Sequence, residues 1–161
     1  MAEQEFVFRL ATQISTGSGL KMAFKDWLHR YADIDGRQLF VGTDSQQATG
    51  VTKFTTCVVS YEPGHGGCYA YVRYQTPRIR ALPERLKTEA WRSIEVALLV
   101  LQELPHAPIV VHIDVNPDVK YKSGILAPGL VGMVTAQGLR AEIKPKAFSA
   151  SHLADQLVKH R

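Results

Sequence analysis

Long apolar runs are missing from this sequence. The longest strongly apolar stretch, Val96 to Leu101, is far below the roughly 20 residues that a membrane-spanning helix requires. The first residues, MAEQEF, carry acids where a secretory signal has basic residues followed by an apolar segment. We therefore expect a cytoplasmic protein with no membrane segment.

Several common catalytic signatures are also absent. The chain has no GxxxxGK[ST] loop, no GxGxxG opening a helix, no paired CxxC, no HExxH and no GxSxG. The sequence therefore offers no motif that indicates a nucleotide-driven enzyme, a zinc enzyme or a serine hydrolase.

Cysteine is scarce. Cys57 and Cys68 lie on the two arms of a predicted hairpin whose turn is Glu62 to Gly67. If Tyr61 faces Cys68 across that turn, then Cys57 faces Val72, and the two sulfurs lie about 13 Å apart at ~3.3 Å per residue. We expect two free thiols.

The remaining composition is that of a globular protein. With 161 residues, 45% apolar and 21% charged, the chain can bury a core without disulfides or a structural metal. No repeat or long Pro/Gly/Ser run divides it, so we predict one domain over 1–161, with a helical extension over 1–36 and a core over 37–161. The net charge of +4 is compatible with a polyanionic partner, although many proteins of this charge bind none.

The hydrophobic pattern predicts the order β-β-β-α-β-α-β-α after a short leading helix. In chain order the predicted elements are a helix over 20–31, strands over 39–45, 52–61 and 68–76, a helix over 83–104, a strand over 108–115, a helix over 123–137, a strand over 139–144 and a helix from 149 onward.

The fourth strand fixes the predicted topology. Its nearly continuous apolar run, PIVVHIDV, is typical of a strand buried on both faces of a sheet. Because a long helix precedes it, a right-handed crossover would place it parallel to and beside the strand over 39–45. The predicted fold class is α/β, a five-stranded mixed sheet with a three-strand antiparallel meander, two parallel strands and helices on both faces.

Two otherwise hydrophobic strands each carry one aspartate near the C-terminal end. These are Asp44 in VGTDSQ and Asp114 in VHIDVN. A carboxylate on a buried strand costs several kcal/mol unless something pairs with it, so two such carboxylates side by side favour a bound cation. Oxygen ligands of this kind suit Mg²⁺ or Mn²⁺. The alternative is that each aspartate caps a following turn.

The order of elements and three sequence stretches resemble a known superfamily. GTDSQ, HIDVNPDVKYKSG and KPKAFSASHLAD are similar to the ribonuclease H-like superfamily and, more narrowly, to the YkuK-like family of uncharacterised bacterial proteins. The resemblance covers about Leu39 to Lys159. It implies a ribonuclease H-like fold and four acids that hold two metal ions for phosphodiester cleavage. Its first-strand and fourth-strand acids match Asp44 and Asp114.

The superfamily places a third acid on the helix after the meander. Four glutamates lie there, namely Glu84, Glu89, Glu95 and Glu103. The resemblance favours Glu89, which lies in the first half of the helix and immediately before Ala90, where the apolar stripe of the helix begins. Glu95 is the reserve candidate. Taken alone, each of these glutamates suits a solvated surface position.

The fourth acid implied by the resemblance is Asp155, on the predicted last helix. His152 lies three residues earlier on the same helix face, a spacing found in related resolvases. His152 could then shuttle protons or contact the phosphate. The alternative is an exposed amphipathic helix on which both side chains are merely polar.

Weaker candidates surround these acids. His112 shares the strand face of Asp114 but suits a core histidine equally, and Asn116 and Asp118 suit either a metal-bound water or a turn around Pro117. Basic residues at element ends and in loops could contact phosphates: Arg78, Arg80, Arg85, Lys120, Lys122, Lys144 and Lys146.

The predicted function is a metal-dependent nuclease, endo- or exonucleolytic, acting on RNA, an RNA–DNA hybrid or structured DNA. A non-catalytic nucleic-acid-binding module of the same fold is the main alternative, and a metal-binding scaffold protein is a third. The oligomeric state is left open.

Overall fold

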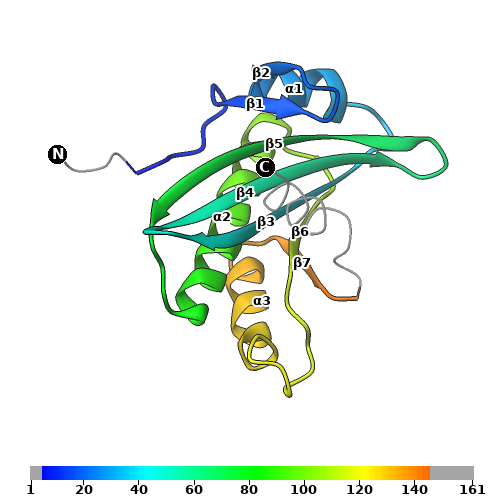
Figure 1. The fold of residues 1–161 in the computed structure, drawn as a ribbon. Helices are drawn as coiled ribbons and strands as arrows, with labels where there is room; N and C mark the ends of the chain where they lie inside the picture. The colour runs from blue at the N-terminus through cyan, green and yellow to red at the C-terminus, as the bar shows by residue number, and fades with distance from the viewer. Residues whose placement is uncertain (1–4, 146–161) are drawn as a thin grey trace.

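The chain folds around one mixed sheet. The structure is a computed structural model and describes residues 5–145 (Figure 1). Its seven strands run in the order β2-β1-β5-β4-β3-β6-β7. Their bounds are β1 Gln13–Thr16, β2 Lys21–Ala23, β3 Gln38–Ala48, β4 Val51–Glu62, β5 Gly66–Pro77, β6 Ile109–Ile113 and β7 Arg140–Ile143.

The centre of the sheet has the predicted topology. β3, β4 and β5 form an antiparallel meander, and β6 lies parallel to and beside β3. β7 continues the sheet parallel to β6. Val41 and Val111 pair between β3 and β6 and are fully buried, in keeping with the apolar run that predicted a central strand.

The longest described helix follows from a proline in its first turn and an apolar stripe. The helices are α1 Phe24–Trp27, a π-helical turn Leu28–Ala32, α2 Leu82–Glu103, a 3-10 turn Gly124–Leu126 and α3 Ala127–Thr135. Pro83 stands in the first turn of α2, and Ala90, Ile94, Ala97 and Val100 form its buried stripe. No helix within residues 5–145 is long and apolar enough to cross a lipid bilayer.

Helices α2 and α3 pack beside each other on one face of the sheet, over Val41, Val58 and Val111 (Figure 1). Helices were predicted on both faces of the sheet, and a last helix was predicted from residue 149 onward. That segment lies outside the described residues.

The five-stranded prediction is wrong in one respect, because two further strands come from the N-terminal segment. The helix predicted over 20–31 is instead β2, the single turn α1 and the π-helical turn. Ile14 pairs with Met22, and Ser15 pairs with Tyr71 of β5. Strands of four and three residues are too short to show a period, and they exist here because they pair with β5.

The β4–β5 register differs by one residue from the predicted one. Tyr61 pairs with Gly67, so Cys68 faces Ser60 and Cys57 faces Tyr71. The connection is shorter than expected because β5 already begins at Gly66. Both cysteines are free, as predicted. Because side chains alternate along a strand, the offset of three residues places the two thiols on opposite faces of the sheet.

Candidate functional site

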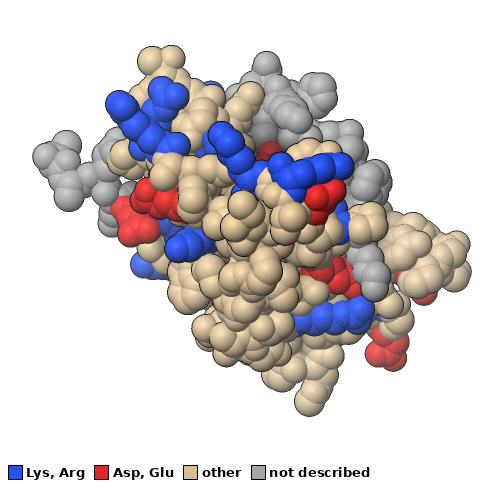
Figure 2. Space-filling model, turned by 90° about the horizontal axis from the view of Figure 1, so that it is seen from below, with Lys and Arg blue, Asp and Glu red and all other residues tan. Residues whose placement is uncertain are grey.

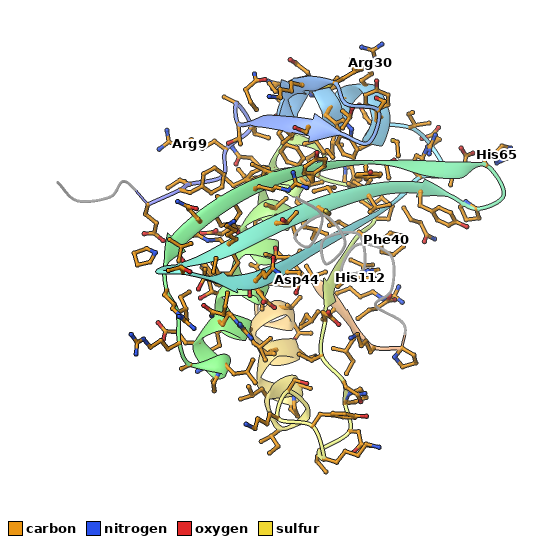
Figure 3. The ribbon with its side chains drawn as sticks, viewed as in Figure 1. Arg9, Arg30, Phe40, Asp44, His65 and His112 are labelled. Carbon is orange, nitrogen blue, oxygen red and sulfur yellow. The ribbon has the colours of Figure 1, made fainter. Side chains whose placement is uncertain are left out.

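The site begins where β3 and β6 part. The last residue pair of their parallel ladder is Gly42 with His112, and β3 then continues beside β4 to Ala48 while β6 ends at Ile113. Asp44 and Asp114 each stand two residues beyond that last pair. Both aspartates therefore lie just past the same end of the ladder, on adjacent strands. Figure 3 labels Asp44 close to His112 in this region.

Strand alternation assigns the residues around Asp44 to two faces of the sheet. Thr43 Oγ1 shares hydrogen bonds with Ser93 Oγ of α2 at 2.8 Å and with Thr56 Oγ1 of β4 at 2.9 Å. Ser45 Oγ donates to Glu89 Oε1, also on α2. Thr43 and Ser45 therefore face the helix, and Asp44 between them lies on the opposite face.

Glu89 is the helix acid that reaches the sheet. Its side chain is buried, with 7% of the residue exposed. Burial raises the pKa of Glu89 to about 8; the hydrogen bond from Ser45 opposes this rise, while the nearby charges of Asp44 and Asp114 add to it. The charges of both aspartates thus act on Glu89 at this end of the sheet.

Asp114 has a cation beside it. Lys144 Nζ, just past the end of β7, lies 2.5 Å from Asp114 Oδ1. The Asp114 side chain is 21% exposed and that of Lys144 is 51% exposed, so the ion pair stands at the boundary with solvent. The Lys144 backbone N–H also donates to the Val115 carbonyl at 3.3 Å, which fixes this end of β7 beside the end of β6.

The donor chemistry of this site suits a hard divalent cation, since Asp44, Glu89 and Asp114 all offer carboxylate oxygens. Within residues 5–145, however, no three His, Cys, Asp or Glu side chains are gathered closely enough to hold a metal ion. Ser45 engages Glu89, and Lys144 engages Asp114. Each of these contacts engages one carboxylate oxygen, so a second oxygen of Glu89 and of Asp114 remains for a metal ion, but the side chains would have to move closer together to share it.

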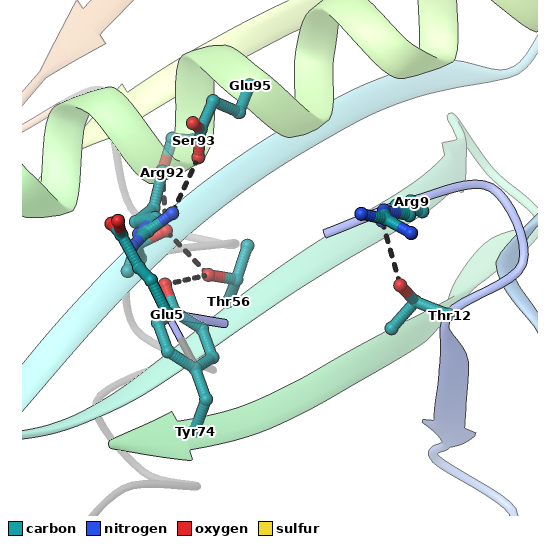
Figure 4. Close-up of polar contacts among 9 residues, drawn as sticks. Glu5, Arg9, Thr12, Thr56, Tyr74, Arg92, Ser93 and Glu95 are labelled. Carbon is teal, nitrogen blue, oxygen red and sulfur yellow. Dashed lines mark hydrogen bonds and ion pairs between the residues drawn. The ribbon is translucent and has the colours of Figure 1, made fainter. Parts of the chain in front are cut away.

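Glu95, the reserve candidate for the helix acid, belongs to another cluster. Arg92 lies 3.1 Å from Glu95 and 2.9 Å from Glu5, and its guanidinium stands over the Tyr74 ring (Figure 4). This cluster ties the N-terminal segment to α2. Its position favours Glu89 over Glu95 as the acid that approaches Asp44.

His112 is a packed core residue. It is 3% exposed, its ring centroid lies 4.7 Å from that of Phe40, and its Nε2 lies 3.3 Å from Glu142 Oε2. Burial lowers the pKa of His112, and the neighbouring Glu142 carboxylate opposes that shift. It shares the strand face of Asp114, as the sequence suggested.

Asn116 and Asp118 form turns. Asn116 Oδ1 accepts a hydrogen bond from the Asp118 backbone N–H, and Asp118 Oδ1 accepts one from the Lys120 backbone N–H, both at 3.0 Å. These are local contacts of the kind that Asn and Asp make around a proline.

Asp155 and His152 lie outside the described residues. Sequence reasoning did not single out Ser45, the partner of Glu89. Strand alternation places Ser45 on the same face as Thr43, but the sequence does not say which face of the strand meets the helix. Lys144 was noted only as one of several basic residues near element ends.

Comparison with known proteins agrees with this arrangement of strands and helices. The family model described as ribonuclease H-like matches residues 26–159. The uncharacterized protein YkuK of Bacillus subtilis (strain 168) is 28% identical over an aligned length of 168 residues, and the alignment covers 88% of this chain and 94% of that protein. The chain belongs to the ribonuclease H-like family.

Proposed function

We propose that this protein is a metal-dependent nuclease that cleaves phosphodiester bonds in RNA, an RNA–DNA hybrid or structured DNA. The supporting observation is the approach of Glu89 to Asp44 and Asp114. Burial raises the pKa of Glu89 and the two nearby aspartates add to the rise, so the ionised glutamate is unfavourable there unless a cation compensates it.

Asp44, Glu89 and Asp114 would hold Mg²⁺ or Mn²⁺, with Asp155 as a further acid and His152 beside it. A bound divalent ion supplies Lewis acidity and neutralises negative charge on the reacting phosphodiester. The chain itself contributes orientation, because Ser45 holds the Glu89 carboxylate against the end of β3.

Basic side chains near this end of the sheet suit a phosphate backbone. Lys144 neutralises Asp114, and the positive charge of Arg85 favours the ionised form of Glu89 by lowering its pKa. Lys120 and Lys122 are exposed on the loop that follows β6. Cations in such positions orient a nucleic acid without reading its sequence.

A specific observation favours a second function, a nucleic-acid-binding module without turnover. In the described part of the chain the acids are not gathered into a metal-holding group, and Lys144 already compensates Asp114. A domain in which the lysine replaces the metal permanently would bind nucleic acid and cut none.

The deciding experiment uses Asp114→Asn. Purified wild type and variant are assayed against labelled RNA, hybrid, duplex and branched DNA with Mg²⁺, Mn²⁺ or chelator. The variant should lose nearly all metal-dependent cleavage and keep its affinity, because a metal ligand is lost while the basic residues remain.

Asp35→Asn is the matched control, since it makes the same chemical change on an exposed turn before β3 and should leave cleavage unchanged. Tight binding by wild type without cleavage under any condition would establish the binding module instead. A wild-type protein that neither binds nor cuts would exclude both functions.

A further inference from the structure

The loop after β6, residues 116–125, exposes several large apolar side chains to solvent. Val119 is 72% exposed, Tyr121 48% and Ile125 70%. Among the large hydrophobic residues of the described chain, Val119 and Ile125 are the two most exposed. Apolar groups gathered on one surface segment mark a contact site more often than isolated ones do.

Hydrogen bonds within the loop hold these side chains in their exposed positions. The Asn116 and Asp118 side chains accept the backbone hydrogen bonds described above, and two backbone bonds close the loop further. The Tyr121 N–H donates to the Asp118 carbonyl at 3.1 Å, and the Gly124 N–H donates to the Tyr121 carbonyl at 3.0 Å. The loop is therefore folded on itself while its apolar side chains point outward.

Gly124 makes this shape possible. A Cβ at Gly124 would lie 2.1 Å from the Asp118 carbonyl oxygen and 3.0 Å from that of Asn116. No larger residue fits there without moving backbone. The base of the loop is closed so tightly that the exposed residues are held in one arrangement.

The charge of the loop indicates the kind of partner. Its tip alternates apolar and basic residues: Val119, Lys120, Tyr121 and Lys122. Lys120 lies 3.1 Å from Asp118 and its Nζ stands 5.2 Å from the Tyr121 ring centroid. Lys122 is exposed and forms no ion pair with another described residue. An aromatic ring between two lysines suits a single strand of nucleic acid, because a base can stack on the ring while the phosphates bind the lysines.

The position of the loop relates it to the candidate site. It starts two residues after Asp114, and Tyr121 is seven residues away, which is no more than about 25 Å of chain. In Figure 1 it forms the tip of the molecule beneath α3, opposite β1 and β2. Figure 2 views the molecule from that end and shows an uncharged area with both basic and acidic side chains around it.

We propose that the 116–125 loop binds an unpaired stretch of the nucleic acid, with Tyr121 stacked on a base and Lys120 and Lys122 at the flanking phosphates. The preferred substrate class is then single-stranded or locally unpaired nucleic acid. This rests on the proposed function only in taking that nucleic acid as the substrate.

The test is binding in EDTA, where no metal-dependent cleavage occurs. Fluorescence anisotropy is measured with oligo(dT), oligo(U) and a blunt duplex of equal length. Tyr121→Ala should weaken single-strand binding roughly tenfold and change duplex binding little, while Tyr121→Phe should bind like wild type. Lys122→Gln should reduce the slope of log affinity against log salt by about 0.7 for a single strand.

Tyr61→Ala is the matched control, since Tyr61 is 40% exposed at the far end of β4. It should leave both affinities unchanged, and melting curves verify that every variant is folded. Equal single-strand affinity for wild type and Tyr121→Ala overturns the proposal. So does self-association in light scattering that Val119→Ser with Ile125→Ser abolishes while nucleic-acid binding is unaffected.

The two proposals fail separately. Cleavage that depends on Asp114 without any contribution of Tyr121 to binding removes the loop proposal and keeps the nuclease. Single-strand binding that depends on Tyr121 without cleavage of any substrate removes the nuclease and keeps the loop.

Discussion

Glu89 is an acid that the fold keeps out of water. Its pKa rises from 4.5 to about 8, first because of burial and further because Asp44 and Asp114 are close. Between these two values the unfolded chain has released the proton that the folded protein retains. Stability should therefore fall as the pH rises through this window, and the contribution of Glu89 is most favourable below the unfolded pKa.

Glu89→Gln should remove this pH dependence, because the amide has no proton to lose. The difference in unfolding free energy between variant and wild type should grow in favour of the variant by up to a few kcal/mol when the pH rises from about 4.5 to about 8.5. Urea unfolding of both proteins at the two pH values measures the gain. Glu84→Gln, on the exposed first turn of α2, is the control. An identical stability difference at both pH values would contradict the prediction.

The residues of the candidate site differ in how far sequence could find them. Asp44 and Asp114 stand out because an acid is rare in an apolar strand. Ser45 and Lys144 do not, since their partners depend on which face of β3 meets α2 and on where β7 ends. A register error of one residue reverses every such assignment.

At the scale of elements, the site depends on the separation of β3 from β6. Parallel pairing between β3 and β6 stops at Gly42 and His112, so Asp44 and Asp114 lie beyond the last paired residues. Helix α2 contacts both strands from one face of the sheet. The acids come from three separate elements, and a cation placed among them would bind only the folded chain.

Mn²⁺ should therefore raise the melting temperature of wild type by several degrees at saturation, since a ligand of the native state stabilises it by mass action. Asp44→Asn should abolish the shift. Glu95→Gln, whose carboxylate belongs to the Arg92 cluster, should retain it. Differential scanning calorimetry with and without the ion gives the result, and no shift in wild type at millimolar Mn²⁺ would refute a metal site here.

Element prediction succeeded where length and periodicity were sufficient. The apolar stripe of α2 and the run in β6 each fixed one element, and the crossover rule then placed β6 beside β3. β1 and β2 were missed because short strands are stabilised by their partners rather than by their own residues. The hairpin register was missed by one residue because the turn length was not fixed by its glycines.

At the scale of the whole molecule, the N-terminal segment is part of the main core. Phe24, Trp27 and Leu28 are fully buried and belong to one cluster with Ile94 of α2 and Val58 of β4. The family match also begins within α1, at residue 26. The segment predicted as an extension therefore packs against the sheet and α2 in one shared core.

Trp27→Ala should cost about 3–5 kcal/mol of unfolding free energy, as expected for a large aromatic removed from a closed core. Trp91→Ala should cost far less, because Trp91 on α2 is 43% exposed. Urea unfolding followed by circular dichroism compares the two, and similar losses would show that the N-terminal segment is not packed as described.

The placement of the two thiols limits how many covalent links each molecule can make. Cys57 is fully buried, and burial raises the pKa of its thiol, whereas Cys68 is partly exposed on the other face of the sheet. Each folded chain thus offers a single accessible sulfur. Oxidation in air can join two chains through Cys68 and must stop there, so the cross-linking valence of the protein is one.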